Sequence, residues 1–169
     1  AHASIVGPPR TLPSAAGRLV QREVEVMEGL RRSPKRPFVA VLGGAKVSDK
    51  LGVIEALVQV VDRLLIGGGM CFTFLAAKGM PIGDSICERD QVDHCKSLMS
   101  RYDKFLLPED IIGLDADGVY ATFGIRLPDG AKGMDIGPGT AAAFSDAIDR
   151  KSTRLNSSHI PLSRMPSSA

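Results

Sequence analysis

The stretch Gly43-Gly44-Ala45-Lys46-Val47-Ser48-Asp49-Lys50 decides the fold, because two different hydrophobic patterns meet at it. The residues before it, 38–42, form an uninterrupted apolar run that is typical of a buried strand. After it, apolar residues recur at the spacing of a helix, at Val47, Leu51, Ile54, Val58 and Val61. We therefore predict a strand, a tight glycine turn and a helix.

This junction is a candidate phosphate site. A helix that follows a strand in this way directs unpaired N–H groups and the positive end of its dipole beyond the strand. Glycine lets the backbone approach a ligand because it has no Cβ atom. Lys46 and Lys50 are four residues apart, so we expect both ammonium groups on one helix face. The spacing alone leaves a second interpretation open, in which the glycines only form a turn and the lysines only solvate the helix.

A second predicted strand also ends in glycines. Residues 62–66 read as a buried strand, Gly67-Gly68-Gly69 follows, and residues 70–75 begin a helix. Neighbouring strands of a parallel sheet that both end in this way share one ligand crevice. The chain lacks the spacing of a P-loop, and Phe72 stands where the dinucleotide fingerprint requires a third glycine.

The rest of the chain predicts more of the same sheet. We expect a third strand over 104–108, a fourth parallel strand over 131–136 with a helix after it, and a strand over 118–123 that pairs with 125–127. Ser85 and Glu88 have the spacing of a capping box for the next helix, and apolar spacing between 12 and 30 predicts a long amphipathic helix. The predicted fold class is α/β, a three-layer Rossmann-like parallel sheet with flanking helices, incomplete.

Composition excludes several classes of function. The 169 residues are 44% apolar, which suits one buried core, and the apolar runs are too short to cross a bilayer. No leader opens the chain, so we expect a soluble, cytoplasmic protein. The three cysteines include no Cys-x-x-Cys pair, and no metal-ligating residues are predicted. Outside a basic tail the charges nearly balance, so we expect no nucleic-acid partner and no membrane partner.

The two glycine segments resemble phosphoglycerate kinase. The matching stretches are Leu42-Gly43-Gly44-Ala45-Lys46-Val47-Ser48-Asp49-Lys50 and Leu65-Ile66-Gly67-Gly68-Gly69-Met70-Cys71-Phe72-Thr73-Phe74. Three further segments are similar to that family's pattern in the same order: Lys35-Arg36-Pro37-Phe38, Gly83-Asp84-Ser85 and Gly133-Met134-Asp135-Ile136-Gly137-Pro138. The resemblance covers about residues 1–148, which correspond to the middle of a two-lobed enzyme.

The resemblance implies a phosphotransferase of glycolysis. It implies reversible phosphoryl transfer between 1,3-bisphosphoglycerate and ADP, giving 3-phosphoglycerate and ATP, with Mg-ATP and Mg-ADP as the nucleotides and a monomeric protein. Lys46 is implied to be catalytic and to lie toward the transferred phosphate. The implied nucleotide-binding residues are Gly44, Ala45, Lys46, Lys50, Gly68 and Gly69 around the phosphates, and Gly133 and Met134 at the adenine and ribose.

The resemblance also divides the chain into three parts. Residues 1–34 are an interlobe segment with a long connecting helix, and 35–149 are a partial nucleotide-binding domain. Residues 150–169 lack periodicity and acidic side chains and resemble a translated sequencing adapter, so we expect them to be disordered. We expect no turnover from this fragment alone. The alternatives are a non-catalytic nucleotide-binding α/β module and a structural fragment that binds nothing.

Overall fold

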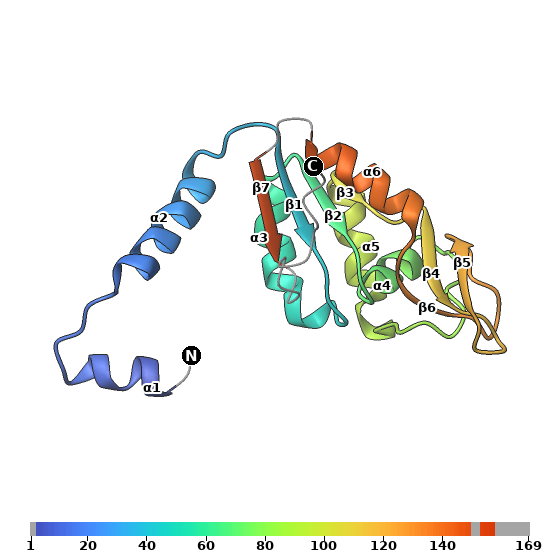
Figure 1. The fold of residues 1–169 in the computed structure, drawn as a ribbon, viewed down its shortest axis with the longest axis horizontal. Coiled ribbons are helices and arrows are strands. Elements are labelled where there is room, and N and C mark those ends of the chain that lie inside the picture. The colour runs from blue at the N-terminus through green and yellow to red at the C-terminus, as the bar shows by residue number, and fades with distance from the viewer. Residues whose placement is uncertain (1–2, 150–152, 158–169) are drawn as a thin grey trace, which may run out of the picture. The chain divides into compact units, whose positions relative to one another are not determined.

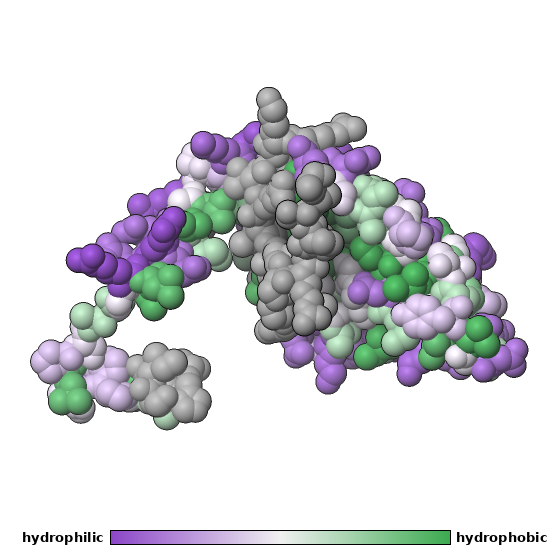
Figure 2. Space-filling view, viewed as in Figure 1, coloured by the Kyte–Doolittle hydropathy of each residue, from purple (hydrophilic) through white to green (hydrophobic). Residues whose placement is uncertain are grey.

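A computed structural model describes residues 3–149 and 153–157 (Figure 1). The chain divides into two compact units, Ala1–Pro34 and Lys35–Ala169, and each is described by itself. The first contains the short helix α1 (Ala3–Val6), the 3-10 turn η1 (Pro8–Arg10) and helix α2 (Arg18–Arg32). Helix α2 confirms the long amphipathic helix, and its apolar side chains are exposed on the surface of this unit (Figure 2).

The second unit is built on a parallel sheet with strand order β3-β2-β1-β7. Its strands are β1 (Phe38–Leu42), β2 (Arg63–Ile66), β3 (Phe105–Leu106) and β7 (Thr153–Ser157), and all three pairings are parallel. The main helices around it are α3 (Leu51–Val60), α4 (Cys71–Ala77), α5 (Val92–Arg101) and α6 (Pro138–Asp149). This arrangement confirms the predicted α/β class with a parallel sheet and flanking helices.

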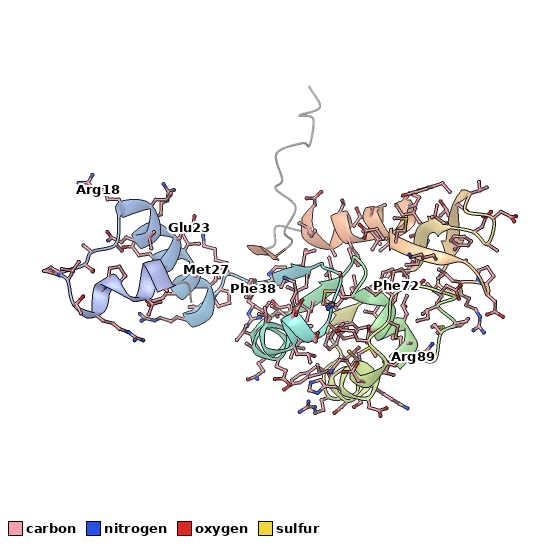
Figure 3. The ribbon with its side chains drawn as sticks, turned by 90° about the horizontal axis from the view of Figure 1, so that it is seen from below. Arg18, Glu23, Met27, Phe38, Phe72 and Arg89 are labelled. Carbon is pink, nitrogen blue, oxygen red and sulfur yellow. The ribbon has the colours of Figure 1, made fainter. Side chains whose placement is uncertain are left out.

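Alternating side chains of the strands bury both faces of this sheet. Val39 and Leu65 pack against Phe144 of α6 on one face. The neighbouring residues Ala40 and Leu64 point to the other face because side chains alternate along a strand, and both are fully buried. Helices α3 and α5 lie on that second face, opposite α6 (Figures 1 and 3). The sheet is therefore the middle of three layers.

The fourth predicted strand belongs to a different sheet. Strand β6 (Lys132–Ile136) pairs antiparallel with β4 (Asp110–Leu114), and β5 (Tyr120–Gly124) pairs antiparallel with β4 on its other side. The prediction of a fourth parallel strand is therefore wrong, and so is the pairing of 118–123 with 125–127. The reason is a tight turn, in which the Asp115 carboxylate accepts hydrogen bonds from the backbone N–H groups of Asp117 and Val119. This turn folds β5 back onto β4.

The structure contradicts the expected disorder at Thr153–Ser157. These residues form β7, which pairs with β1 in a register that places Phe38 opposite Thr153. Without β7, β1 would be an edge strand with unpaired N–H and C=O groups, and backbone pairing requires no apolar pattern in the added strand. The remainder of the predicted tail, 150–152 and 158–169, lies outside the described residues.

Within the residues described, no helix combines the length and the apolar character that crossing a bilayer requires.

Candidate functional site

The two glycine turns lie against each other at the carboxyl ends of β1 and β2. Gly67 N–H donates to the Leu42 carbonyl at 2.9 Å, and Met70 N–H donates to the Gly44 carbonyl at 2.8 Å. A Cβ atom on Gly68 would lie only 2.9 Å from the backbone nitrogen of Gly44. The two main chains are therefore in direct contact, with no side chain between them.

The second turn needs glycine for its conformation as well as for its contacts. Gly68 has a φ of +64°, in the left-handed region that favours glycine. A Cβ atom on Gly69 would lie 3.3 Å from the Cα atom of Ala45. The structure thus brings together Gly44, Ala45, Gly68 and Gly69, the four residues whose backbone was predicted to face a phosphate.

The lysines do not share a helix face as predicted. Helix α3 begins at Leu51, and the 3-10 turn η2 (Ser48–Lys50) precedes it. Lys46 therefore lies in the irregular turn before η2, and its side chain is exposed. The Lys50 side chain reaches back over the first turn, since its Cε atom is 3.2 Å from where a Cβ atom on Gly44 would lie. Both lysines remain at the glycine turns, but through different geometry.

The end of β6 joins the two turns. The Asp135 carboxylate accepts a hydrogen bond from Gly68 N–H at 3.0 Å and another from Ile136 N–H at 2.8 Å. The Ile136 side chain lies 3.4 Å from where a Cβ atom on Gly67 would stand. The carboxyl end of β6 thus reaches the same place as those of β1 and β2, although β6 belongs to another sheet.

Gly133 and Met134 of β6 differ in their surroundings. A Cβ atom on Gly133 would overlap the Phe72 ring, and Gly133 N–H donates to the Ser85 hydroxyl at 2.9 Å. Gly133 is therefore required for packing of β6 against α4. Met134 is half-exposed, as a residue that contacts a ligand would be. Their predicted place at the adenine and ribose stays a prediction.

Glu88 anchors the first turn in a way that the sequence does not indicate. Its Oε2 atom accepts a hydrogen bond from Ser48 N–H at 2.9 Å, and its Oε1 atom accepts one from the Ser48 hydroxyl at 2.6 Å. Partial burial alone would raise the pKa of Glu88, but the hydrogen bonds from Ser48 and Val47 outweigh it and lower the pKa. The predicted capping box is wrong, because Ser85 instead donates to the Ile82 carbonyl and accepts from Gly133.

Asp110 caps the N-terminus of α6. Its carboxylate accepts hydrogen bonds from the backbone N–H groups of Gly139 at 2.8 Å and Thr140 at 2.6 Å. Burial would raise the pKa of Asp110, but the bonds from Thr140 and Gly139 prevail and lower it. Sequence reasoning missed this role because the two segments lie about 30 residues apart. This helix end is therefore already occupied by a carboxylate of the protein.

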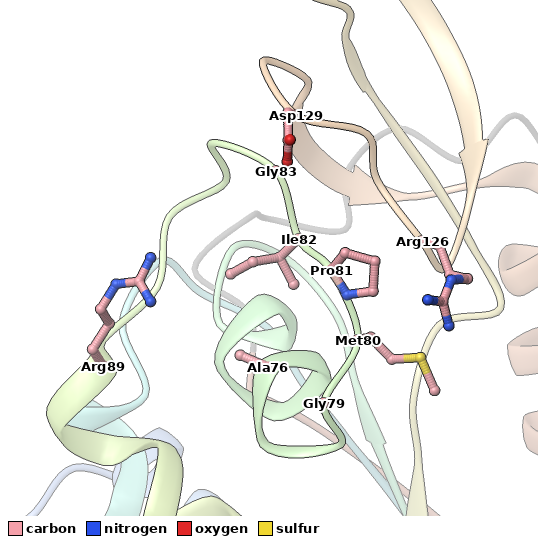
Figure 4. Close-up of a pocket in the computed structure, with 9 residues that line it drawn as sticks. All are labelled: Ala76, Gly79, Met80, Pro81, Ile82, Gly83, Arg89, Arg126 and Asp129. Carbon is pink, nitrogen blue, oxygen red and sulfur yellow. The ribbon is translucent and has the colours of Figure 1, made fainter.

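Other features of the described residues lie away from the glycine turns. A hollow of about 550 Å³ near Arg89 and Arg126 is lined by neither turn (Figure 4). A second, of about 380 Å³, lies beside β3.

Two further findings concern thiols and metal ligands. Burial raises the pKa of the Cys71 thiol, the nearby Asp135 carboxylate raises it further, and the pKa reaches about 12, so the thiol stays neutral. Among the described residues, no group of three or more His, Cys, Asp or Glu side chains is placed to hold a metal ion.

The sequence matches one protein family over most of its length. The family model described as Phosphoglycerate kinase matches residues 1–158. The phosphoglycerate kinases of Parafrankia sp. (strain EAN1pec) and Salinispora tropica are 51% and 52% identical over 153 and 152 residues, which are 88% and 87% of this chain. The chain spans 38% of the length of each of these relatives.

Solved structures agree on the fold. The structure of phosphoglycerate kinase from Coxiella burnetii matches 83% of this chain with a TM-score of 0.77 and 33% identity, and 38% of that protein is covered. The crystal structure of phosphoglycerate kinase from Pyrococcus horikoshii OT3 matches 90% of this chain with a TM-score of 0.76 and 26% identity, and 41% of that protein is covered.

Proposed function

The chain belongs to the phosphoglycerate kinase family, and from this premise we propose that it is the nucleotide-binding part of a glycolytic kinase. The proposed reaction of the whole enzyme is reversible phosphoryl transfer between 1,3-bisphosphoglycerate and ADP, giving 3-phosphoglycerate and ATP. Because this chain spans 38% of the length of its relatives, we expect no turnover from it alone. We further propose that the enzyme is a cytoplasmic monomer with small-molecule partners.

The observation that carries this proposal is the contact between the two glycine turns. Gly44 and Ala45 lie against Gly68 and Gly69 main chain to main chain, and the Asp135 carboxylate holds the N–H group of Gly68 in place. Lys50 lies over this main chain and Lys46 is exposed next to it. A polyphosphate needs both close approach to the backbone and positive counter-charge, and these residues supply the two together.

Phosphoryl transfer demands positioning and charge neutralisation more than covalent chemistry from the protein. In the proposed reaction an oxygen of the ADP β-phosphate forms a bond to the phosphorus of the acyl phosphate. The bond from that phosphorus to the carboxyl oxygen breaks, and 3-phosphoglycerate leaves as a carboxylate. Lys46 is the proposed catalytic residue because its exposed ammonium group is free to follow the transferred phosphoryl group, while Lys50 neutralises the inner phosphates.

The remaining nucleotide contacts are proposed at β6. Met134 supplies an apolar, half-exposed surface for the adenine or ribose, and Gly133 keeps β6 close to α4. Mg²⁺ enters with the nucleotide, on the phosphate oxygens that it prefers.

Mg-ADP titration by calorimetry tests the proposal on the 169-residue chain. We expect the wild-type chain to bind, and Lys50→Ala to weaken binding about tenfold or more, because a charged contact to phosphate contributes about 1.5–3 kcal/mol. Lys96→Ala is the matched control, since Lys96 is an exposed lysine of α5 outside the site. Absence of heat with the wild-type chain would favour a structural fragment that binds nothing. Equal binding by Lys50→Ala would exclude the proposed phosphate site.

A further inference from the structure

We infer that Glu88 is a positioning residue of the nucleotide site, which acts by holding Ser48 and with it the turn that carries Lys46 and Lys50. This inference rests on the proposed function. Both carboxylate oxygens of Glu88 bind Ser48, one at the backbone N–H and one at the hydroxyl, at 2.9 and 2.6 Å. A two-point contact of this kind fixes the orientation of Ser48 as well as its position.

The rest of the turn shows why this contact matters. Val47 is fully buried and holds the turn from the inside, while Lys46 and Ser48 on either side of it are exposed. No regular helix hydrogen bonds hold Lys46, because it precedes the 3-10 turn η2. The hydrogen bonds that Ser48 donates to Glu88 therefore restrain the exposed side of this segment, in addition to the packing of Val47.

Glu88 also connects the first turn to the second. Its backbone N–H donates to the Thr73 hydroxyl at 3.2 Å, and Thr73 is a buried residue of α4, the helix that follows Gly67–Gly69. One residue thus contacts the segment after each glycine turn.

The negative charge of Glu88 argues against direct contact between its side chain and a phosphate. A carboxylate repels phosphate, and the hydrogen bonds that lower the pKa of Glu88 keep it ionised at neutral pH. Both of its oxygens already accept hydrogen bonds from Ser48. Glu88 therefore contributes to nucleotide affinity through the turn.

Mg-ADP titration of variants separates positioning from general stabilisation. We expect Glu88→Ala to weaken binding about tenfold and Ser48→Ala about threefold, and the double variant to bind like Glu88→Ala, because the two residues act through one contact. Glu88→Gln should recover most of the affinity, since an amide accepts from Ser48 N–H and donates to the hydroxyl. Glu55→Ala is the matched control, because Glu55 joins α3 to His94 of α5 at 2.9 Å, away from the turn.

Amide hydrogen exchange without nucleotide provides the second readout. In Glu88→Ala, Ser48 N–H should lose protection from exchange while the amides of β1 and β2 keep theirs. Loss of protection in β1 and β2 as well would instead reveal that the variant unfolds globally. Unchanged Ser48 protection, or Mg-ADP affinity equal to that of the wild type, would overturn the inference alone. A wild-type chain that does not bind Mg-ADP would overturn the proposed function, and the role inferred for Glu88 with it.

Discussion

Replacing Gly68 with alanine is expected to abolish measurable Mg-ADP binding and to lower the free energy of unfolding by about 3 kcal/mol. Two costs add in this variant. A non-glycine residue at a φ of +64° is strained by about 1–2 kcal/mol. The new Cβ atom would also lie 2.9 Å from the nitrogen and 3.0 Å from the oxygen of Gly44, which are backbone atoms that no side-chain rotation can move.

Gly79→Ala is the matched control for this prediction. Gly79 has a similar φ of +75°, but nothing lies within 4 Å of the position of its Cβ atom. This variant should cost only the backbone strain, about 1 kcal/mol, and should keep Mg-ADP affinity. Urea unfolding and calorimetry of both variants measure the difference. Equal stability loss and equal binding in the two variants would mean that the glycine turns do not contact each other.

Replacing Asp110 with alanine is expected to lower the free energy of unfolding by about 2–3 kcal/mol at pH 7. The change leaves the first N–H groups of α6, at Gly139 and Thr140, without their carboxylate partner, and it removes a negative charge from the positive end of the helix dipole. Asp146→Ala, an exposed position in the same helix, should change stability little.

The stabilisation of the fold by Asp110 should decrease as the pH is lowered. Its pKa is lowered in the folded state, so its stabilisation is fully present above the pKa of the unfolded chain, about 4. As the pH falls through the lower pKa of the folded state, the carboxylate is protonated and the stabilisation disappears. The difference in urea midpoint between wild type and Asp110→Ala should be constant above about pH 5 and should shrink below about pH 4. A difference that grows on acidification would contradict the cap.

Local sequence patterns were sufficient for the centre of the fold. The apolar runs of β1 and β2, each followed by glycines and a helix, predicted both turns and their common place at the sheet edge. The resemblance carried by the same segments is confirmed by the family model and by relatives about half identical to the chain. These features depend on residues that are neighbours in the sequence, where periodicity and turn chemistry apply directly.

What could not be predicted depends on partners distant in the sequence. Glu88 lies 40 residues from Ser48, and Asp110 lies 30 residues from Thr140. Strand β6 pairs antiparallel with β4, and β5 lies between these two strands in the sequence. The lysines were misplaced because a 3-10 turn delays the start of α3 to Leu51. For Glu88, Asp110 and β6 a tertiary hydrogen bond or strand pairing prevailed over a local pattern, whereas the position of the lysines depends on a local 3-10 turn.

Backbone amide shifts during an Mg-ADP titration, followed by nitrogen-15 NMR of the 169-residue chain, test the central claim most directly. The claim is that the paired glycine turns form the phosphate site. The largest shifts should fall on Gly44, Ala45, Gly68 and Gly69, with smaller ones at Met134. Largest shifts instead at the hollow near Arg89 and Arg126, with the glycine amides unmoved, would contradict it.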